Sequence, residues 1–300
     1  MKSILIVGGT GFVGYHLAKK CINKNWLVSS ISTKKPKKLR KLKGVKYIIC
    51  DITNFKNIKK KLKKKKYDYV VNLGGYVDHK NKVKTYNSHY IGVKNLFNFF
   101  KTKDVRKFIQ VGSSNEYGAV NSPQVESSIC KPKTIYGKAK FLASQFLLNQ
   151  YNKVAFPVII IRFYQLYGPY QDNNRFIPQL INSSLRKTFF LTSSGKQLRD
   201  FLYIDDGVNA ILKSLKNKEI NGNIINIGTG KPIQLIKVMH LVKRKTNYFN
   251  PIFGKVKLRK DENKIIYPKI DLAKKLLKWK FRISLEQGLD KTIKFYKRLA

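Results

Sequence analysis

Two side chains with acid–base chemistry, Tyr136 and Lys140, stand four residues apart in a run over 134–151 whose apolar spacing predicts a helix. Residues at i and i+4 share one face of a helix, so the phenol and the ammonium group would lie side by side. A nearby ammonium group stabilises phenolate and lowers the pKa of tyrosine from its usual value of about 10. Tyr136 could then give or take a proton near neutral pH. Because such a pair is frequent by chance in a lysine-rich chain, its meaning depends on the elements around it.

A glycine-rich loop opens the first predicted helix. Gly8, Gly11 and Gly14 follow an apolar strand candidate over 4–7 and lead into a helical pattern over 12–23. Glycines at this spacing allow a tight turn, close approach of a ligand to the backbone, and close packing of helix on strand. The N–H groups at the start of the helix would face a pyrophosphate. The loop therefore predicts dinucleotide binding.

The residues at the end of the second predicted strand indicate which cofactor the protein prefers, NAD or NADP. Proteins of this type that select NAD place Asp or Glu there, where it accepts hydrogen bonds from the ribose 2′-OH. Here the strand ends in Ser32, Thr33, Lys34 and Lys35, and no acidic residue precedes Asp51. Hydroxyl and ammonium groups suit a 2′-phosphate. We expect NADP, with NAD as the alternative because lysine enrichment alone could place these lysines.

Strand and helix patterns alternate along the first half of the chain. The predicted strands are 4–7, 27–31, 47–50, 69–73, 108–111 and 158–161, and the predicted helices include 12–23, 87–100, 134–151, 205–215, 233–243, 271–277 and 285–297. This alternation is typical of a parallel sheet covered on both faces. We expect a doubly wound α/β (Rossmann) domain over 1–170 with a return near 200–230. A smaller, discontinuous substrate-binding domain would comprise 171–199 and 231–300.

Composition is that of a globular protein with a lysine-rich surface. Of the 300 residues 43% are hydrophobic, and the apolar stretches are far shorter than the roughly 20 residues that span a bilayer. Lysine and arginine total 62 against 16 acidic residues, but lysine dominates this excess and is spread along the whole chain. We therefore expect no specific nucleic-acid partner and no membrane attachment. Three scattered cysteines and the absence of a secretory signal favour the cytoplasm and predict no metal site.

Several segments jointly resemble the extended short-chain dehydrogenases/reductases, in the NAD-dependent epimerase/dehydratase group that acts on nucleotide sugars. They are the glycine loop, Asp51-Ile52, Asn72-Leu73-Gly74-Gly75, 112–118, Tyr136 with Lys140, 162–169, Arg199-Asp200-Phe201, 226–230 and Trp279. The resemblance covers nearly the whole chain. It implies a nucleoside-diphosphate sugar as substrate, a nicotinamide cofactor and a homodimer formed through the helices near 86–100 and 134–151. A dinucleotide-binding regulator without catalytic activity is an alternative function. Such a protein would not need to retain Ser113, Tyr136 and Lys140.

The resemblance also implies roles for individual residues. Ser113, Tyr136 and Lys140 would be catalytic, with Ser114 as the alternative serine and a substrate contact. The cofactor would be held by Gly8, Thr10, Gly11, Phe12, Val13, Gly14, Ser32, Thr33, Lys34, Asp51, Ile52, Leu73, Gly74, Gly75, Tyr136 and Lys140. Gln165, Arg199 and Arg259 would contact the substrate, the two arginines at its diphosphate. Gln165 departs from the group, since many relatives carry Asn there.

Within this group the segments 75–79, 87–89 and 112–118 are most similar to the dTDP-4-dehydro-6-deoxyglucose reductases. We therefore expect an NADP-dependent reductase of a 4-keto-6-deoxy nucleotide sugar, and a UDP-glucose 4-epimerase-like enzyme with bound NAD is the main alternative. A 4,6-dehydratase fits less well, because that group carries Asp and Glu where this chain has Ser114 and Asn115, although a gapped match would use Glu116. His79 and His89 receive no chemical role, since a structural histidine explains either equally well.

Overall fold

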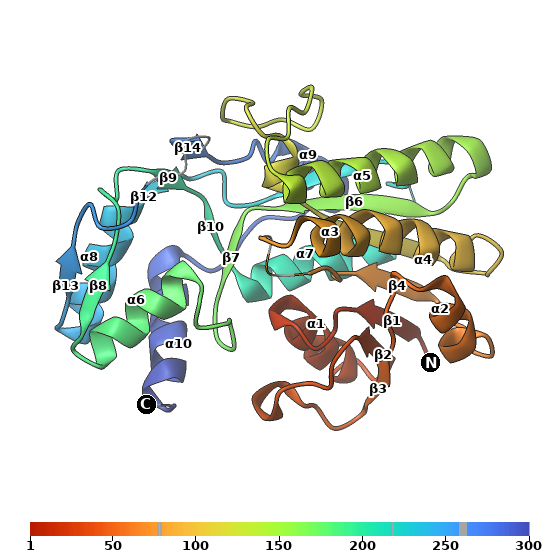
Figure 1. Ribbon diagram of the computed structural model, residues 1–300, viewed down its shortest axis with the longest axis horizontal. Helices are drawn as coiled ribbons and strands as arrows, with labels where there is room; N and C mark the ends of the chain where they lie inside the picture. The colour runs from red at the N-terminus through yellow and green to blue at the C-terminus, as the bar shows by residue number, and fades with distance from the viewer. Residues whose placement is uncertain (77, 79, 218, 258–262, 300) are drawn as a thin grey trace.

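The computed structural model describes residues 1–76, 78, 80–217, 219–257 and 263–299. Its main element is a sheet of seven strands in the order β11-β6-β5-β4-β1-β2-β3, all paired in parallel (Figure 1). The strands are β1 (Ser3–Val7), β2 (Leu27–Ser32), β3 (Val45–Ile49), β4 (Tyr69–Asn72), β5 (Lys107–Ser113), β6 (Val158–Phe163) and β11 (Ile224–Ile227). The predicted doubly wound parallel sheet is confirmed.

The order of the strands places a crevice at one edge of the sheet. The chain runs outward from β1 to β2 and β3, then crosses to β4 and continues through β5 and β6 on the other side. In doubly wound sheets, ligands bind where the order reverses, outside the carboxyl ends of the strands. The ends of β1, β4 and β5 therefore define where the predicted site residues must meet.

Burial explains why these segments form strands. Every residue of β4 and β6 is buried, and β6 contains the continuous apolar run Val-Ile-Ile-Ile. Such runs are typical of central parallel strands that are covered on both faces. β3, at the edge of the sheet, instead mixes half-buried and exposed residues. This pattern suits a strand with one neighbour.

Helices cover both faces of the sheet. Those of one face are α1 (Phe12–Ile22) and α7 (Ile204–Lys216), and those of the other are α2 (Phe55–Leu62), α3 (Lys82–Tyr86), α4 (Gly92–Phe100) and α5 (Ile135–Val154). Thr134 caps α5 by accepting a hydrogen bond from the Gly137 N–H at 3.0 Å. A π-helical turn, Asn87–Ile91, joins α3 to α4. The predicted helix over 87–100 therefore has a wider first turn than expected.

A second group of elements lies beside the sheet, at the left of Figure 1. It contains α6 (Phe176–Leu185), β8 (Phe189–Leu191), α8 (Leu235–Thr246), β13 (Asn250–Ile252) and α10 (Leu285–Lys297). The short strands β7 (Gln165–Tyr167), β9 (Leu198–Arg199), β10 (Phe201–Tyr203), β12 (Ile233–Gln234) and β14 (Ile265–Ile266) and the helix α9 (Asp271–Leu277) connect it to the sheet domain. α6 packs against α8 and α10, and β8 pairs with β13. That this group binds the substrate stays a prediction.

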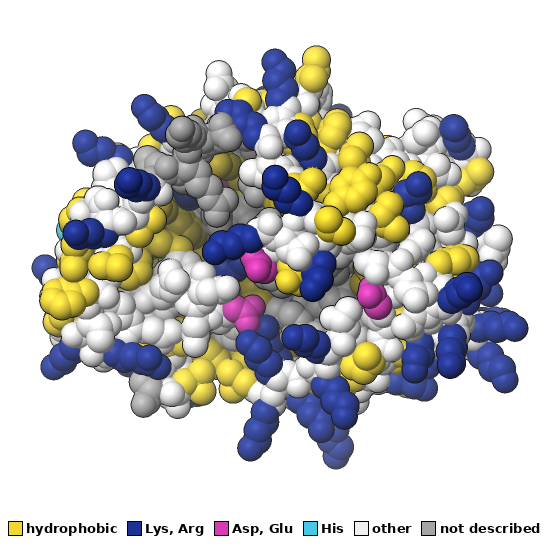
Figure 2. Space-filling model, in the orientation of Figure 1, with side chains coloured by type: hydrophobic (Ala, Val, Ile, Leu, Met, Phe, Trp, Pro, Cys, Tyr) yellow, Lys and Arg dark blue, Asp and Glu magenta, His cyan; other side chains and the backbone are white. Residues whose placement is uncertain are grey.

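Positive charge is distributed rather than concentrated. Figure 2 shows lysine and arginine side chains spread over the whole visible face. This distribution agrees with the general lysine enrichment inferred from the sequence. Within the described residues, no helix is long and apolar enough to cross a membrane.

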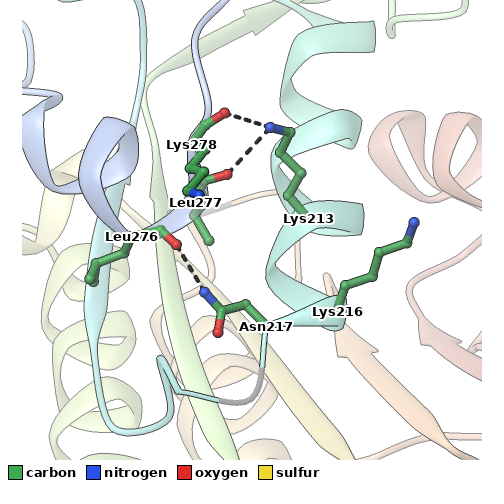
Figure 3. A pocket seen from close by; sticks show the side chains of 6 residues that line it. All are labelled: Lys213, Lys216, Asn217, Leu276, Leu277 and Lys278. Carbon is green, nitrogen blue, oxygen red and sulfur yellow. Dashed lines mark hydrogen bonds between the residues drawn. The ribbon is translucent and has the colours of Figure 1, made fainter.

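Backbone carbonyls at the end of α9 are bound by side chains of α7 and the residue after it. Lys213 Nζ donates hydrogen bonds to the carbonyl oxygens of Leu277 at 3.3 Å and Lys278 at 2.5 Å (Figure 3). Asn217 Nδ2 donates to the Leu276 carbonyl at 2.9 Å. These bonds cap a helix C-terminus, where cations are favourable. The pocket of about 240 Å³ between the two helices is therefore a structural junction.

Lys107 on β5 is a buried cation next to this junction. The residue is 1% exposed, and its Nζ donates hydrogen bonds to the Asn217 carbonyl at 2.7 Å and to Asn221 Oδ1. Burial lowers the pKa of Lys107 to about 8. In the unfolded chain a lysine has a pKa of about 10.4. Between these values the unfolded chain binds the extra proton, so the contribution of Lys107 to stability rises with pH.

Comparison of the wild type with Lys107→Met tests this linkage. From pH 7 to pH 9.5 we expect the free energy of unfolding of the wild type to rise by about 2 kcal/mol relative to that of the variant. Urea unfolding of both proteins at the two pH values measures this change. A difference between the two proteins that is the same at both pH values would contradict the assignment.

Candidate active site

The fold brings Ser113 and Tyr136 together at the carboxyl end of β5. Ser113 is the last residue of that strand, and Tyr136 lies in the first turn of α5. The Ser113 hydroxyl shares a hydrogen bond with the Tyr136 phenol. Gly137 makes this approach possible, because a Cβ there would lie 2.5 Å from the Asn115 carbonyl oxygen. The start of α5 is thus packed directly on the turn that follows Ser113.

Lys140 lies one turn further along α5 and is buried. Its Nζ donates a hydrogen bond of 2.6 Å to the Val111 carbonyl oxygen on β5. Burial lowers the pKa of Lys140 to about 8, and the negative charge of Glu116 opposes that shift. The ammonium group is therefore directed at the backbone of the strand that ends in Ser113.

The predicted lowering of the Tyr136 pKa is wrong for this structure. Burial raises the pKa of Tyr136 above its usual value. The hydrogen bond with Ser113 and the positive charge of Arg175 act in the opposite direction, and Glu116 adds to the rise. The physical reason is desolvation of the phenolate, together with a Lys140 ammonium group that is bound to the Val111 carbonyl.

A buried ion pair between Glu116 and Arg162 holds the backbone of Ser113. Glu116 and Arg162 are both fully buried, and Arg162 contacts Glu116 Oε2 through Nε at 2.9 Å and Nη2 at 2.8 Å. Glu116 Oε1 accepts a hydrogen bond from the Ser113 backbone N–H at 2.8 Å. A Cβ at Gly112 would overlap this carboxylate, so the glycine is needed there. Glu116 is thus a buried carboxylate with both oxygens bonded within the protein. The gapped match to the dehydratases, which would use Glu116, stays untested.

The glycine loop forms the expected cradle at the end of β1. Gly8 has φ +76° and its N–H donates to the Ile31 carbonyl at 2.8 Å. A Cβ at Gly14 would lie 2.6 Å from the Gly8 carbonyl oxygen, so the helix can approach the loop only with glycine there. Gly11 is the N-cap of α1 and has no side chain with which to cap the helix. A helix N-terminus behind a glycine cradle fits the pyrophosphate of a dinucleotide.

The other predicted cofactor residues lie at the carboxyl ends of neighbouring strands. Thr10 Oγ1 donates to Ser32 Oγ at 3.0 Å, which joins the glycine loop to the end of β2. Asp51 Oδ1, just beyond β3, accepts hydrogen bonds from the N–H and the hydroxyl of Thr53 at 2.9 and 2.8 Å. The remaining residues of the set follow the same edge: Phe12 and Val13 begin α1, Thr33 and Lys34 follow β2, Ile52 follows Asp51, and Leu73, Gly74 and Gly75 follow β4.

A pocket of about 210 Å³ lies between the segment that follows β6 and the start of α6. Its lining includes the predicted residue Gln165, and also Asn174 and Arg175 at the start of α6. Ser113 pairs in register with Phe163, so Gln165 lies only two residues beyond the neighbouring strand end. Arg175 is a residue of this pocket that the sequence motifs do not predict, although arginine is rare in this lysine-rich chain. Its charge favours the phenolate of Tyr136, which places it in the electrostatic environment of the site.

The remaining predicted substrate residues have different outcomes. Ser114 is half-buried and begins the 3₁₀ turn that follows β5. Arg199 is 6% exposed, and its Nη1 donates to the carbonyls of Leu198 at 2.8 Å and Lys264 at 3.2 Å. Its role at a diphosphate stays a prediction. Arg259 lies outside the described residues, as does His79.

Comparison with known proteins agrees with this geometry. The family model described as "NAD dependent epimerase/dehydratase family" matches residues 4–228. The uncharacterized protein MJ1055 of Methanocaldococcus jannaschii is 26% identical over 97% of this chain and 94% of its own length. The dTDP-D-glucose 4,6-dehydratase of Dictyostelium discoideum is 30% identical over 79% of this chain, which spans 61% of that enzyme.

A solved structure shares the fold over the full length. The UDP-glucose 4-epimerase of Thermotoga maritima, determined with UDP-glucose, superposes with a TM-score of 0.93 at 23% identity and covers 99% of both chains. The resemblance stated from the sequence is confirmed by the family match and by this fold. With its glycine cradle and its Ser113–Tyr136 pair at one edge of a Rossmann sheet, the chain belongs to the NAD dependent epimerase/dehydratase family.

Proposed function

We propose that this protein is an NADP-dependent oxidoreductase that reduces the ketone of a 4-keto-6-deoxy nucleotide sugar, of the dTDP-4-dehydro-6-deoxyglucose type. The observation that carries the proposal is the hydrogen bond between Ser113 and Tyr136. Arg175, whose charge favours the Tyr136 phenolate, lines the same pocket as Gln165. A serine hydroxyl and a phenol that converge on one point can bind and protonate a single oxygen atom.

The proton chemistry of the site suits reduction. Burial holds the pKa of Tyr136 above its usual value, so the phenol keeps its proton at neutral pH. Ser113 would donate a hydrogen bond to the ketone oxygen, and Tyr136 would give its proton to that oxygen as negative charge develops on it. The bound nicotinamide cofactor supplies the hydride for carbon 4. Lys140, whose pKa is about 8, is mostly protonated at pH 7 and would stabilise the phenolate that remains.

The end of β2 supports NADP over NAD. Thr33 and Lys34 are exposed there, and Ser32 is bonded to Thr10 of the glycine loop. The first acidic residue in the chain, Asp51, already accepts two hydrogen bonds from Thr53. Hydroxyl and ammonium groups can bind a 2′-phosphate, whereas the carboxylate that usually binds a free 2′-OH is missing from this strand end.

Steady-state kinetics with both cofactors test the assignment. We expect kcat/KM for NADPH to exceed that for NADH by about tenfold or more, because the 2′-phosphate gains charge-assisted hydrogen bonds. Ser32→Asp should reverse this preference, since a carboxylate repels the phosphate and accepts from a 2′-OH. Lys60→Ser, an exposed substitution on α2, is the matched control and should leave the ratio unchanged. Equal or better use of NADH by the wild type would overturn the NADP assignment.

A 4-epimerase that uses bound NAD is the second candidate. The fold match to the Thermotoga maritima epimerase and the NAD-dependent character of the family favour it. An epimerase must first take a proton from the 4-hydroxyl, which requires the phenolate form of Tyr136. Interconversion of UDP-glucose and its 4-epimer without added cofactor, by protein purified with NAD bound, would establish this activity instead.

The same proposal includes a two-fold dimer and a cytoplasmic location. Figure 2 shows hydrophobic side chains gathered over α5 and α3. Leu142 of α5 and Val83 of α3 are exposed. Pairing of this surface with its copy would bury it. The free thiols of Cys21, Cys50 and Cys130 suit a reducing compartment.

A further inference from the structure

We propose that His89 is a positioning residue that fixes Tyr136 relative to the loop that follows β4. The inference rests on the proposed function, in which Tyr136 is the proton donor. His89 lies in the π-helical turn between α3 and α4, and its side chain is buried, with 5% of the residue exposed. π-helical turns widen a helix locally and are frequent at functional sites. Three contacts of His89 carry the argument.

The first contact is with the backbone of Gly75. Gly75 has φ +155°, and a Cβ at this residue would overlap the His89 ring. The imidazole is therefore in direct contact with the chain at the end of the segment Leu73–Gly75, which we assign to the cofactor. A side chain at position 75, or a larger side chain at position 89, would separate the loop after β4 from the π-helical turn.

The second contact is with Tyr76. His89 Nε2 lies 3.2 Å from the Tyr76 carbonyl oxygen, and the preceding residue, Ser88, accepts a hydrogen bond from the Tyr76 N–H at 2.8 Å. A carbonyl oxygen can only accept, so Nε2 must carry the proton. Consecutive side chains of the π-helical turn thus hold both backbone groups of Tyr76.

The third contact is with the catalytic phenol itself. The rings of His89 and Tyr136 have centroids 4.9 Å apart and planes at 79°, which is the edge-to-face arrangement that aromatic pairs prefer. One side chain therefore touches the loop beyond β4 on one side and Tyr136 on the other. A proton donor must be held within a fraction of an ångström of its working position, and misplacement by about 1 Å can cost a hundredfold in rate.

Variants at position 89 distinguish a residue that positions Tyr136 from one that only fills space in the core. His89→Phe keeps a ring against Tyr136, so we expect kcat within threefold of wild type. It removes the hydrogen bond to Tyr76, so KM for NADPH should rise. His89→Ala and His89→Asn remove the ring, and we expect each to lower kcat tenfold or more. His240→Ala is the control, because this histidine of α8 is exposed and its ring contacts Phe249, not Tyr136 or Tyr76.

The same variants in a Tyr136→Phe background supply the decisive measurement. If His89 acts by orienting the Tyr136 phenol, His89→Ala should slow Tyr136→Phe by less than threefold in single-turnover reduction. Circular dichroism and thermal midpoints identify any variant that does not fold, and His89→Asn then replaces His89→Ala in both backgrounds.

The outcomes are distinguishable from failure of the proposed function. If Tyr136→Phe is much slower than the wild type but His89→Ala keeps the wild-type rate, only this inference is overturned. Equal loss of kcat in the Phe and Ala variants, or the same fold-loss in both backgrounds, also overturns it. A Tyr136→Phe enzyme within threefold of wild type overturns the inference and the proposed function together.

Discussion

Tyr136→Phe is expected to reduce turnover of a 4-keto nucleotide sugar by about a hundredfold or more, the usual range for loss of a general acid. The substitution keeps the ring and its edge-to-face contact with His89, so the backbone around the site should be unchanged. It removes the transferable proton and the hydrogen bond with Ser113. Cofactor affinity should stay within about threefold, because the phenol oxygen acts mainly on the sugar.

Single-turnover kinetics and cofactor titration measure the two quantities separately. Tyr151→Phe is the matched control, since Tyr151 lies on the same helix but packs in the core cluster of α2, α4 and α5. We expect that control to retain the wild-type rate. A Tyr136→Phe enzyme within threefold of wild type would show that Ser113, Tyr136 and Lys140 are not the catalytic set.

Glu116→Ala is expected to lower the free energy of unfolding by about 3–5 kcal/mol, the range for removal of one partner of a buried ion pair. The substitution leaves the Arg162 guanidinium group buried without its carboxylate and takes the acceptor away from the Ser113 N–H. Because that N–H fixes the end of β5, we expect activity to fall as well. Urea unfolding and turnover measure the two effects.

An exposed ion pair in the same chain provides the control. Glu286 and Arg244 are 3.8 Å apart with most of each side chain in solvent, so Glu286→Ala should cost less than about 1 kcal/mol. The double variant Glu116→Leu with Arg162→Met removes both charges and should be more stable than Glu116→Ala alone. Equal small losses at Glu116 and Glu286 would falsify the structural role of the buried pair.

The sheet could be predicted because its strands are continuous apolar runs bounded by polar residues. The expected strand over 158–161 lies within β6, and the expected helices over 271–277 and 285–297 coincide with α9 and α10. The two-residue strands β9, β12 and β14 could not be predicted, because their pairing with one another depends on tertiary contacts. Helix α6 was missed, since Pro178 in its first turn resembles a helix break.

The candidate site could be predicted in its residues but not in its electrostatics. The glycine spacing and the Tyr-x-x-x-Lys pair are visible in sequence, and strand ends of a parallel sheet meet at one edge. The pKa of Tyr136 depends on burial and on the direction of the Lys140 side chain, which no spacing reveals. Arg175 lies 39 residues after Tyr136 in the sequence. It reaches the site only because the chain turns back between β6 and α6.

The position of β11 at the edge of the sheet has a consequence for synthesis on the ribosome. β6, which is buried along its whole length, acquires its outer neighbour only when 224–227 has been translated, about sixty residues after β6 itself. Until then the nascent chain presents an unpaired apolar strand edge, the kind of surface on which other chains pair and aggregate. Chaperone protection during this interval would therefore matter most for the segment that later supports Ser113 through Arg162.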